Sequence, residues 1–142
     1  MRTFFIDTSF YVAILNRRDN LRPIAQELHA QLLAEPDVMF VTTEAILVEL
    51  LTRMAGLGPD ARALAVRFVS RALVDPQVLV VPFSSDLFAQ ALDLYRRRPD
   101  KTYSMTDCMS MAVCREHGIT DVLTSDHDFE QEGFTILLAG RP

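Results

Sequence analysis

The chain has 142 residues, of which 49% are hydrophobic and 23% charged, and these values are ordinary for a single globular domain. Its formal net charge is −5, which excludes nucleic-acid binding through overall positive charge and leaves only local basic patches for such contacts. The apolar runs are far shorter than the ~20 residues of a membrane span, and no basic segment with a cleavage site opens the chain, so we expect a cytoplasmic protein.

The chain opens with a short apolar run that ends in an acid. Phe4, Phe5 and Ile6 predict a strand buried on both faces of a parallel sheet, and Asp7 follows directly. In open α/β sheets ligands bind at the carboxyl ends of strands, so an acid at this position is placed for chemistry. The alternative is that Asp7 or Thr8 caps the helix that follows. This stretch alone does not decide between the two interpretations.

Helical and strand patterns alternate along the rest of the chain. Helical spacing and capping residues predict helices at about 10–15, 21–34, 44–55, 60–73, 84–97 and 103–117. Compact apolar runs predict further strands at 38–41, 78–81, 119–123 and 134–138. This alternation predicts one α/β domain over residues 1–142, in which helices cover both faces of a five-stranded parallel sheet in three layers.

The helix predicted over 44–55 carries an acid inside an apolar run. Its middle is apolar almost all round, which is typical of a buried helix. Glu49 lies within this run, and glutamate is rarely buried unless it is paired or binds a metal. The alternative is that Glu49 occupies the one solvent-exposed strip of the helix. Glu44 lies in the first turn, where the helix dipole favours an acid, and we assign it no chemistry.

Two further acids lie at the start of a helix and after a strand. Ser104 and Asp107 have the spacing of a capping box at the start of a helix with almost no polar face. Asp126 follows the strand predicted over 119–123. Right-handed crossovers place all loops that follow parallel strands at one edge of the sheet. We therefore expect four carboxylates to converge there, namely Asp7, Glu49, Asp107 and Asp126.

Several carboxylates in close proximity repel one another and raise one another's pKa. No Lys or Arg lies beside any of the four in the sequence, so a divalent cation is the expected counter-charge. Oxygen-only ligands favour Mg²⁺ or Mn²⁺ over zinc, and the histidines are scattered while Cys108 and Cys114 are expected core residues. Such a site suits metal-assisted hydrolysis of a phosphodiester, in which one ion activates a water and the ions stabilise charge on the phosphate and leaving oxygen.

The densest positive patch consists of Arg96, Arg97 and Arg98, with Lys101 close by. One interpretation is that these cations only complement the dipole at the C-terminal end of a helix. The functional interpretation is that the patch contacts RNA.

Four motifs together resemble the PIN domain, and more narrowly the VapC-type ribonuclease toxins of bacterial toxin–antitoxin pairs. They are Ile-Asp7-Thr-Ser, Glu49 inside an apolar helix, Ser104-x-x-Asp107, and Leu-Thr124-Ser-Asp126-x-Asp128-Phe129, and they span nearly the whole chain. The resemblance implies a PIN-like five-stranded parallel sheet, Mg²⁺ or Mn²⁺ dependence, and cleavage of structured RNA of the tRNA or rRNA type to arrest translation. It also implies homodimers and neutralisation by a small cognate antitoxin.

The same resemblance implies a role for each site residue. The catalytic acids are Asp7, Glu49, Asp107 and Asp126. The metal ligands are Asp7, Asp107 and Asp126, with Asp128 as an additional member. The supporting residues are Thr8, Ser9, Ser104 and Thr124, of which Thr8 and Ser9 would hold the first acid or a metal-bound water.

Three other classes of protein also gather acids at a sheet edge. A haloacid-dehalogenase-type phosphatase requires Asp-x-Asp, and Ser9 stands at its second position here. A receiver domain requires paired acids after its first strand and a lysine after its last, and this chain has neither. The remaining alternative is a catalytically silent PIN-like interaction module. Such a module is expected to lose some of the acids, and because all four are present the nuclease is favoured.

An antitoxin would have to neutralise the acidic pocket. We expect an arginine of its tail to pair with two carboxylates at once and displace the metal. An amphipathic antitoxin segment would dock on exposed apolar residues around Leu28 and Leu32, unless those leucines belong to the core.

Overall fold

Five parallel strands form one sheet in the order β3-β2-β1-β4-β5. In this computed structural model, which describes residues 1–138, β1 (Arg2–Ile6) lies at the centre between β2 (Val38–Thr43) and β4 (Asp121–Leu123). β3 (Val78–Val81) and β5 (Thr135–Ile136) form the two edges. The predicted five-stranded parallel sheet is therefore confirmed.

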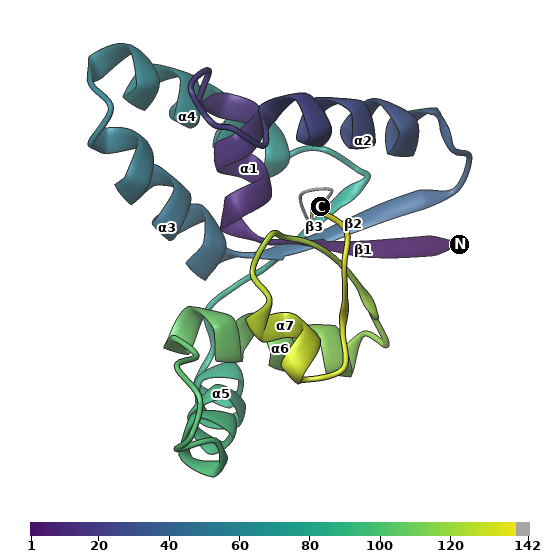
Figure 1. Cartoon of the computed structure of the whole chain (residues 1–142), viewed down its shortest axis with the longest axis vertical. Helices are drawn as coiled ribbons and strands as arrows, with labels where there is room; N and C mark the ends of the chain where they lie inside the picture. Colours follow the sequence, from purple (N-terminus) through teal and green to yellow (C-terminus); the bar gives the residue numbers. More distant parts are fainter. Residues whose placement is uncertain (139–142) are drawn as a thin grey trace.

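Helices cover both faces of this sheet (Figure 1). One layer contains α1 (Thr8–Leu15), α2 (Arg22–Ala34), α3 (Glu44–Ala55) and α4 (Pro59–Ala72). The other contains α5 (Ser85–Arg97), α6 (Met105–Glu116) and α7 (Asp128–Gln131). The three-layer α/β/α architecture expected from the alternating pattern is confirmed. Within residues 1–138, no helix is long and apolar enough to cross a membrane.

The central strand is buried because it has a neighbour on each side and a helical layer on each face. Phe4 and Phe5 point to opposite faces and are both fully buried, and the Phe4 ring packs 6.2 Å from that of Phe40 on β2. Burying each phenylalanine contributes roughly 2–3 kcal/mol. The two cysteines are free and buried, as expected of core residues.

The ends of several elements differ from those predicted. β2 extends to Thr43, whose hydroxyl accepts a hydrogen bond from the Ile46 amide and caps α3. β5 has two residues instead of the five predicted, and β4 has three. At the end of β4 the Thr124 amide bonds back to the Val122 carbonyl, although the amides of Leu137 and Leu138 still donate to Val122 and Thr124. The sequence analysis also missed α7, whose four residues are too few to show a helical period.

Candidate active site

The two central strands end side by side at the edge where their loops lead into helices. Ile6 is paired with Leu123, so Asp7 and Thr124 leave the sheet as neighbours. The order of the strands reverses between β1 and β4, because β2 lies on one side of β1 and β4 on the other. Such a reversal leaves a crevice at the carboxyl ends of the strands, where α/β proteins bind ligands.

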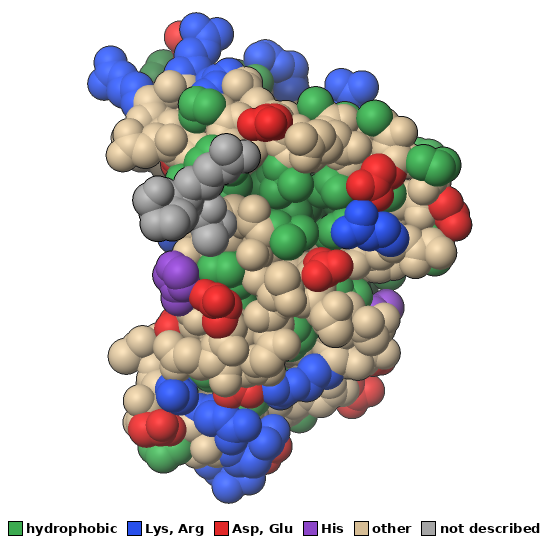
Figure 2. Space-filling model, turned by 45° about the vertical axis from the view of Figure 1, so that its right-hand side comes forward, with side chains coloured by type: hydrophobic (Ala, Val, Ile, Leu, Met, Phe, Trp, Pro, Cys, Tyr) green, Lys and Arg blue, Asp and Glu red, His purple; other side chains and the backbone are tan. Residues whose placement is uncertain are grey.

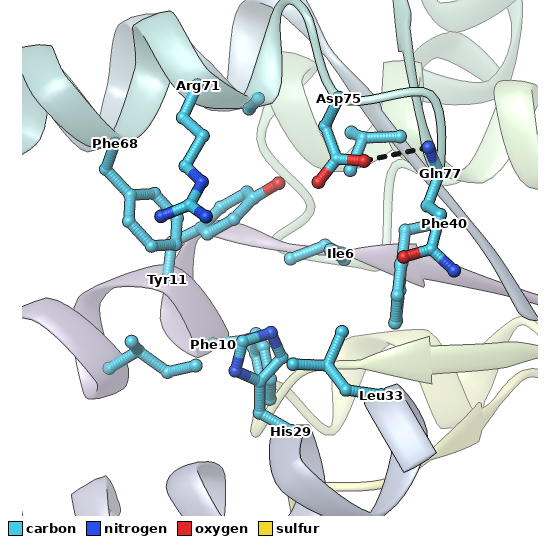
Figure 3. A pocket seen from close by; sticks show the side chains of 13 residues that line it. Ile6, Phe10, Tyr11, His29, Leu33, Phe40, Phe68, Arg71, Asp75 and Gln77 are labelled. Carbon is cyan, nitrogen blue, oxygen red and sulfur yellow. Dashed lines mark hydrogen bonds between the residues drawn. The ribbon is translucent and has the colours of Figure 1, made fainter. Parts of the chain in front are cut away.

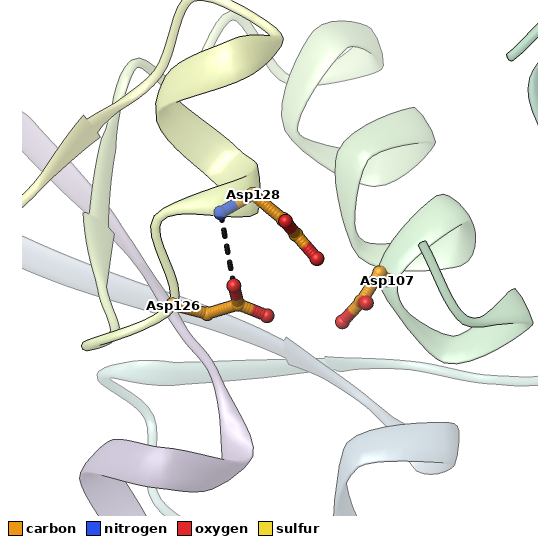
Figure 4. A group of neighbouring side chains, drawn as sticks. All are labelled: Asp107, Asp126 and Asp128. Carbon is orange, nitrogen blue, oxygen red and sulfur yellow. Dashed lines mark hydrogen bonds between the residues drawn. The ribbon is translucent and has the colours of Figure 1, made fainter. Parts of the chain in front are cut away.

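Three carboxylates meet in this crevice (Figure 4). Asp107, Asp126 and Asp128 each offer one oxygen, and these three oxygens lie within 4.8 Å of one another. Asp107 comes from the first turn of α6, whereas the other two come from the loop after β4 and the start of α7. All three side chains are partly buried. The structure therefore brings together three of the four predicted metal ligands.

Backbone amides donate hydrogen bonds to the carboxylates of Asp107 and Asp126. The Asp107 Oδ2 accepts a 3.0 Å hydrogen bond from the Ser104 amide, and the Ser104 hydroxyl accepts one of 3.0 Å from the Asp107 amide. The predicted capping box is thus confirmed. In the other segment, the Asp128 amide donates to Asp126 Oδ1 at 2.9 Å, and the Asp126 amide donates to the Thr124 hydroxyl at 3.1 Å. Ser104 and Thr124 therefore position the acids through hydrogen bonds.

Asp7 is more deeply buried than these three partly buried acids, since it is only 6% exposed. Its Oδ2 accepts a 2.7 Å hydrogen bond from the Thr124 hydroxyl. The Thr124 hydroxyl has one hydrogen, which it donates to Asp7, so in its 3.1 Å contact with Ser9 the Ser9 hydroxyl is the donor. The Ser9 hydroxyl oxygen also accepts a hydrogen bond from the Ser125 amide. Ser9 therefore supports Asp7 through Thr124 and not by direct contact.

The capping alternative for the first acid is not supported by the geometry. Asp7 occupies the N-cap position of α1, but its side chain makes no capping hydrogen bond. Among the described residues, the buried hydroxyl of Thr8 has no hydrogen-bond partner. Asp7 lies outside the group whose oxygens are mutually within 4.8 Å, and its role as a metal ligand stays a prediction.

Glu49 differs from expectation in two respects. Its helix is buried on one side only, and the Glu49 side chain is 33% exposed beside the exposed Val48. A cation also lies close, since Arg53, one helical turn later, approaches Glu49 Oε1 to 3.5 Å. The positions directly beside Glu49 hold no Lys or Arg, but a residue four positions later on a helix lies on the same face and can form an ion pair. Glu49 therefore occupies the solvent-exposed strip, at the margin of the site.

The acids nevertheless share one electrostatic environment. Burial raises the pKa of Asp7 to about 6 despite the Thr124 hydrogen bond, and the charges of Asp107 and Glu49 add to this rise. Burial also raises the pKa of Asp107, with contributions from Asp126 and Glu49. The pKa of Asp128 is raised by burial and then by Asp126. Asp7, Asp107 and Asp128 therefore resist ionisation chiefly because they are buried, and the charges of neighbouring acids add to the effect.

The donor set fits a divalent cation. Among residues 1–138, no Lys, Arg or His forms an ion pair with Asp7, Asp107, Asp126 or Asp128. The group consists of carboxylate oxygens alone, which are the ligands that Mg²⁺ and Mn²⁺ prefer. A bound cation would also remove the mutual repulsion that raises the pKa values.

The predicted basic patch is divided between different partners. Arg96 and Arg97 both pair with Asp93 on α5, at 2.7 and 2.8 Å. Arg98 pairs with Glu132 at 2.6 Å, and Lys101 has only a 3.7 Å ion pair with Asp100. Three of the four cations are therefore engaged in ion pairs of 2.6–2.8 Å, and contact of the patch with RNA stays a prediction.

Glu132 is a residue that the sequence analysis missed. Its side chain is only 4% exposed, and it accepts hydrogen bonds from Arg98, Tyr103 and Arg115. These contacts tie the end of α7 to α6 and to the loop before it, and so fix Asp128 relative to Asp107. No local pattern marks Glu132, because the donors lie 17 to 34 positions away.

Comparison with known proteins agrees with the motifs and the fold. The model of the PIN domain matches residues 4–134. The 23S rRNA-specific endonuclease VapC20 of Mycobacterium tuberculosis is 33% identical over 133 residues, which cover 92% of this chain and 94% of the relative. Ribonuclease VapC23 of the same species is 27% identical over 123 residues, or 87% and 92% of the two chains.

Solved structures show the same architecture. The crystal structure of M. tuberculosis VapC20, described as a sarcin-ricin loop cleaving toxin, superposes with a TM-score of 0.81 at 29% identity and covers 93% of this chain and 96% of that chain. VapBC2 from Rickettsia felis shares the fold at 12% identity, with a TM-score of 0.64 over 94% and 96% of the two chains. The acids, the sheet that positions them and these relatives together show that this chain belongs to the PIN domain family, as a VapC-type toxin endoribonuclease.

Proposed function

We propose that this toxin hydrolyses structured RNA of the ribosomal type in the cytoplasm, with Mg²⁺ or Mn²⁺ bound by its acids, and thereby arrests translation. The observation that carries the proposal is the group formed by Asp107, Asp126 and Asp128, whose oxygens lie within 4.8 Å of one another and have no basic partner among residues 1–138. The relative at 33% identity is named for cleavage of 23S rRNA, which supports ribosomal RNA as the substrate class.

The three grouped carboxylates would hold the cation, with Asp7 as the fourth proposed ligand. When bound, the cation supplies activation of a water and stabilisation of the charge that develops on the phosphate. Asp7 Oδ2 accepts a hydrogen bond from the Thr124 hydroxyl. This bond keeps the Thr124 oxygen oriented to accept from the Asp126 amide. Asp107 is held in one orientation by its capping box, which preorganises the site before RNA arrives.

The test is cleavage of a ribosomal stem-loop RNA by the purified protein. We expect cleavage with Mg²⁺ or Mn²⁺, none in EDTA, and none from Asp107→Asn. The Asn side chain retains an oxygen that accepts from the Ser104 amide, so this variant should remain folded. Cleavage that persists in EDTA, or that requires Zn²⁺, would refute the proposed metal site.

We also propose that an antitoxin segment docks in a cavity on the opposite helical layer. A cavity of about 400 Å³ lies between the sheet and helices α1, α2 and α4 (Figure 3). Phe10, Leu33 and Phe68 form apolar walls, with Arg71 and Asp75 also at the cavity. Hydrophobic side chains gather in a hollow on this face of the molecule (Figure 2). An amphipathic helix would fill such a cavity with its apolar side.

The docking residues differ from those that the sequence suggested. Leu32 is buried in the core and Leu28 is partly buried against the core, so Leu32 is not free to bind a partner. Leu33, the next residue, is exposed and lines the cavity. The structures of VapBC2 from Rickettsia felis and FitAcB from Neisseria gonorrhoeae share this fold, and the complexes in which these chains occur support a protein partner here.

A homodimer is proposed from the exposed side of α5. Phe88 and Leu92 are exposed hydrophobic side chains of α5, Phe83 is exposed just before the helix, and a second copy would bury all three. Light scattering on the purified protein measures the mass, and Leu92→Asp should convert a dimer to a monomer. A wild-type monomer at micromolar concentration would contradict this assignment.

A further inference from the structure

A second, smaller cavity lies at the C-terminal end of α5. It measures about 210 Å³ and is lined by Tyr95, Arg98, Pro99, Lys101, Thr102 and Tyr103. Its wall contains two cations and three hydroxyl groups, in contrast to the apolar cavity on the other layer. Lys and Arg side chains gather at this lower end of the molecule (Figure 2).

Two walls of this cavity are held rigidly. Arg98 Nε donates to Glu132 at 2.6 Å, and the Tyr103 hydroxyl donates to the same carboxylate at 3.2 Å. Glu132 also accepts from Arg115 at 2.6 Å, so one carboxylate faces two guanidinium groups. The group of Arg98, Glu132 and Arg115 therefore keeps a net positive charge beside the cavity.

Lys101 is the cation of this cavity that is free to bind an anion. It is the only lysine of the chain. Its Nζ lies 3.7 Å from Asp100, whose side chain is 70% exposed, and exposed pairs at such distances contribute little. The Lys101 side chain is itself one-third exposed, so an incoming anion would exchange one weak, hydrated contact for a closer one.

The cavity adjoins the acidic group. Tyr103 in the cavity wall is followed directly by Ser104, whose amide donates a 3.0 Å hydrogen bond to Asp107 Oδ2. The Tyr103 hydroxyl also donates to Glu132, the C-cap of α7, and α7 begins at Asp128. A polyanion approaching the acids therefore passes beside Lys101.

We propose that this cavity binds one backbone phosphate of the RNA substrate, next to the phosphate that is cleaved, with Lys101 as the main contact and Arg98 as a fixed positive wall. The inference rests on the proposed ribonuclease function and names a subsite for it. The acids repel phosphate groups, so RNA needs a nearby cation to hold the chain in place. Arg96 and Arg97 do not line the cavity and are both paired with Asp93.

The test measures binding of a fluorescein-labelled ribosomal stem-loop RNA in EDTA, where no cleavage is expected. Lys101→Gln should weaken binding several-fold and reduce the slope of log affinity against log salt by about 0.7–0.9, as expected for the loss of one phosphate contact. Arg96→Gln removes the same charge from the neighbouring paired residue and should bind like the wild type. Lys101→Arg keeps the charge and should restore the slope.

Kinetics separate this subsite from the catalytic acids. With Mg²⁺ present, Lys101→Gln should raise KM and leave kcat within about two-fold, because the contact is equally present in the ground and transition states. Equal affinities and slopes for Lys101→Gln and Arg96→Gln would overturn the proposal. So would loss of antitoxin binding with RNA binding intact, because the cavity would then belong to the protein interface. If the wild type binds RNA but does not cleave it, the proposed function fails while the subsite stands.

Discussion

The hydroxyl of Thr124 donates a 2.7 Å hydrogen bond to Oδ2 of Asp7, and the two residues are 117 positions apart in the sequence. This contact joins the ends of the two central strands. Thr124 also accepts from the Asp126 amide, so the same hydroxyl connects the buried acid to the exposed ones. The arrangement of the site therefore depends on this side chain.

Thr124→Val should shift the pH dependence of cleavage. Valine has the same shape but no donor, so the pKa of Asp7 should rise further above about 6. The acid limb of the kcat/KM profile should then move to higher pH, and the protein should lose about 2 kcal/mol of stability at pH 7.5, the cost of removing a hydrogen bond to a charged group. Thr124→Ser keeps the donor and should keep the profile. An unchanged profile in Thr124→Val would show that Asp7 does not depend on this bond.

Asp7→Asn should abolish cleavage and raise the melting temperature at pH 7.5 in EDTA. The native pKa of Asp7 is raised from 3.8 to about 6, so the folded protein binds the proton more tightly than the unfolded chain. The contribution of Asp7 to the free energy of unfolding is therefore fully present below about pH 4. It falls as the pH rises through 6, and the total loss is at most about 3 kcal/mol. The advantage of the variant should disappear near pH 4.

The control for this comparison is Asp121→Asn, at the other end of β4. It should show no pH-dependent gain of this kind. A melting temperature that falls by several degrees in Asp7→Asn, with cleavage retained, would mean that Asp7 is a structural residue.

Binding of a divalent cation should be measurable without RNA. Because the cation binds the folded state, Mn²⁺ at 100 times its Kd should stabilise the protein by about 2.7 kcal/mol. Asp107→Asn should lose most of this thermal shift and should not be less stable than the wild type in EDTA. Glu44→Gln is the control. Glu44 is an acid of α3 whose Oε1 accepts a hydrogen bond from the Phe83 amide, and its replacement should leave the thermal shift caused by Mn²⁺ unchanged. Equal shifts in all three proteins would contradict the assigned ligands.

Glu132→Gln should destabilise the protein and reduce kcat together. The pKa of Glu132 is lowered because the hydrogen bonds from Arg98, Arg115 and Tyr103 outweigh the rise caused by burial. Removing the charge leaves two guanidinium groups facing a neutral amide, which should cost about 2 kcal/mol or more. The difference in stability between the wild type and Glu132→Gln should become smaller at low pH. The reason is that a carboxylate with a lowered pKa loses its stabilising effect as the pH falls through that pKa. Glu130→Gln, on the exposed side of α7, is the matched control, and a similar effect there would refute the role of Glu132.

An antitoxin arginine should be required for inhibition. A guanidinium pairs with two carboxylates at once, and the group of Asp107, Asp126 and Asp128 offers three without a partner cation in residues 1–138. The product of the neighbouring upstream gene should be tested with each arginine changed to alanine in turn. One such change should restore RNA cleavage while the complex still forms in a pull-down. If no single arginine affects inhibition, the cavity on α1, α2 and α4 must account for it.

The sequence determined the fold class and the acids that define the site. Runs such as Phe4 to Ile6 are buried in any parallel sheet, and the alternation of strands with helices leaves few topologies. Asp7 and Asp126 follow predicted strands, so the carboxyl edge was predictable as their meeting place. The capping box of Ser104 and Asp107 was readable because its hydrogen bonds are local.

Only the tertiary structure decided which acids actually meet. Asp128 joins Asp107 and Asp126 because α7 begins there, while Asp7 turns inward to Thr124. The sequence also did not predict that Arg96 pairs with Asp93 whereas Arg98 pairs with Glu132. The physical reason is that hydrogen bonds and ion pairs reach only about 3–4 Å, and no local sequence pattern encodes which distant side chains approach that closely.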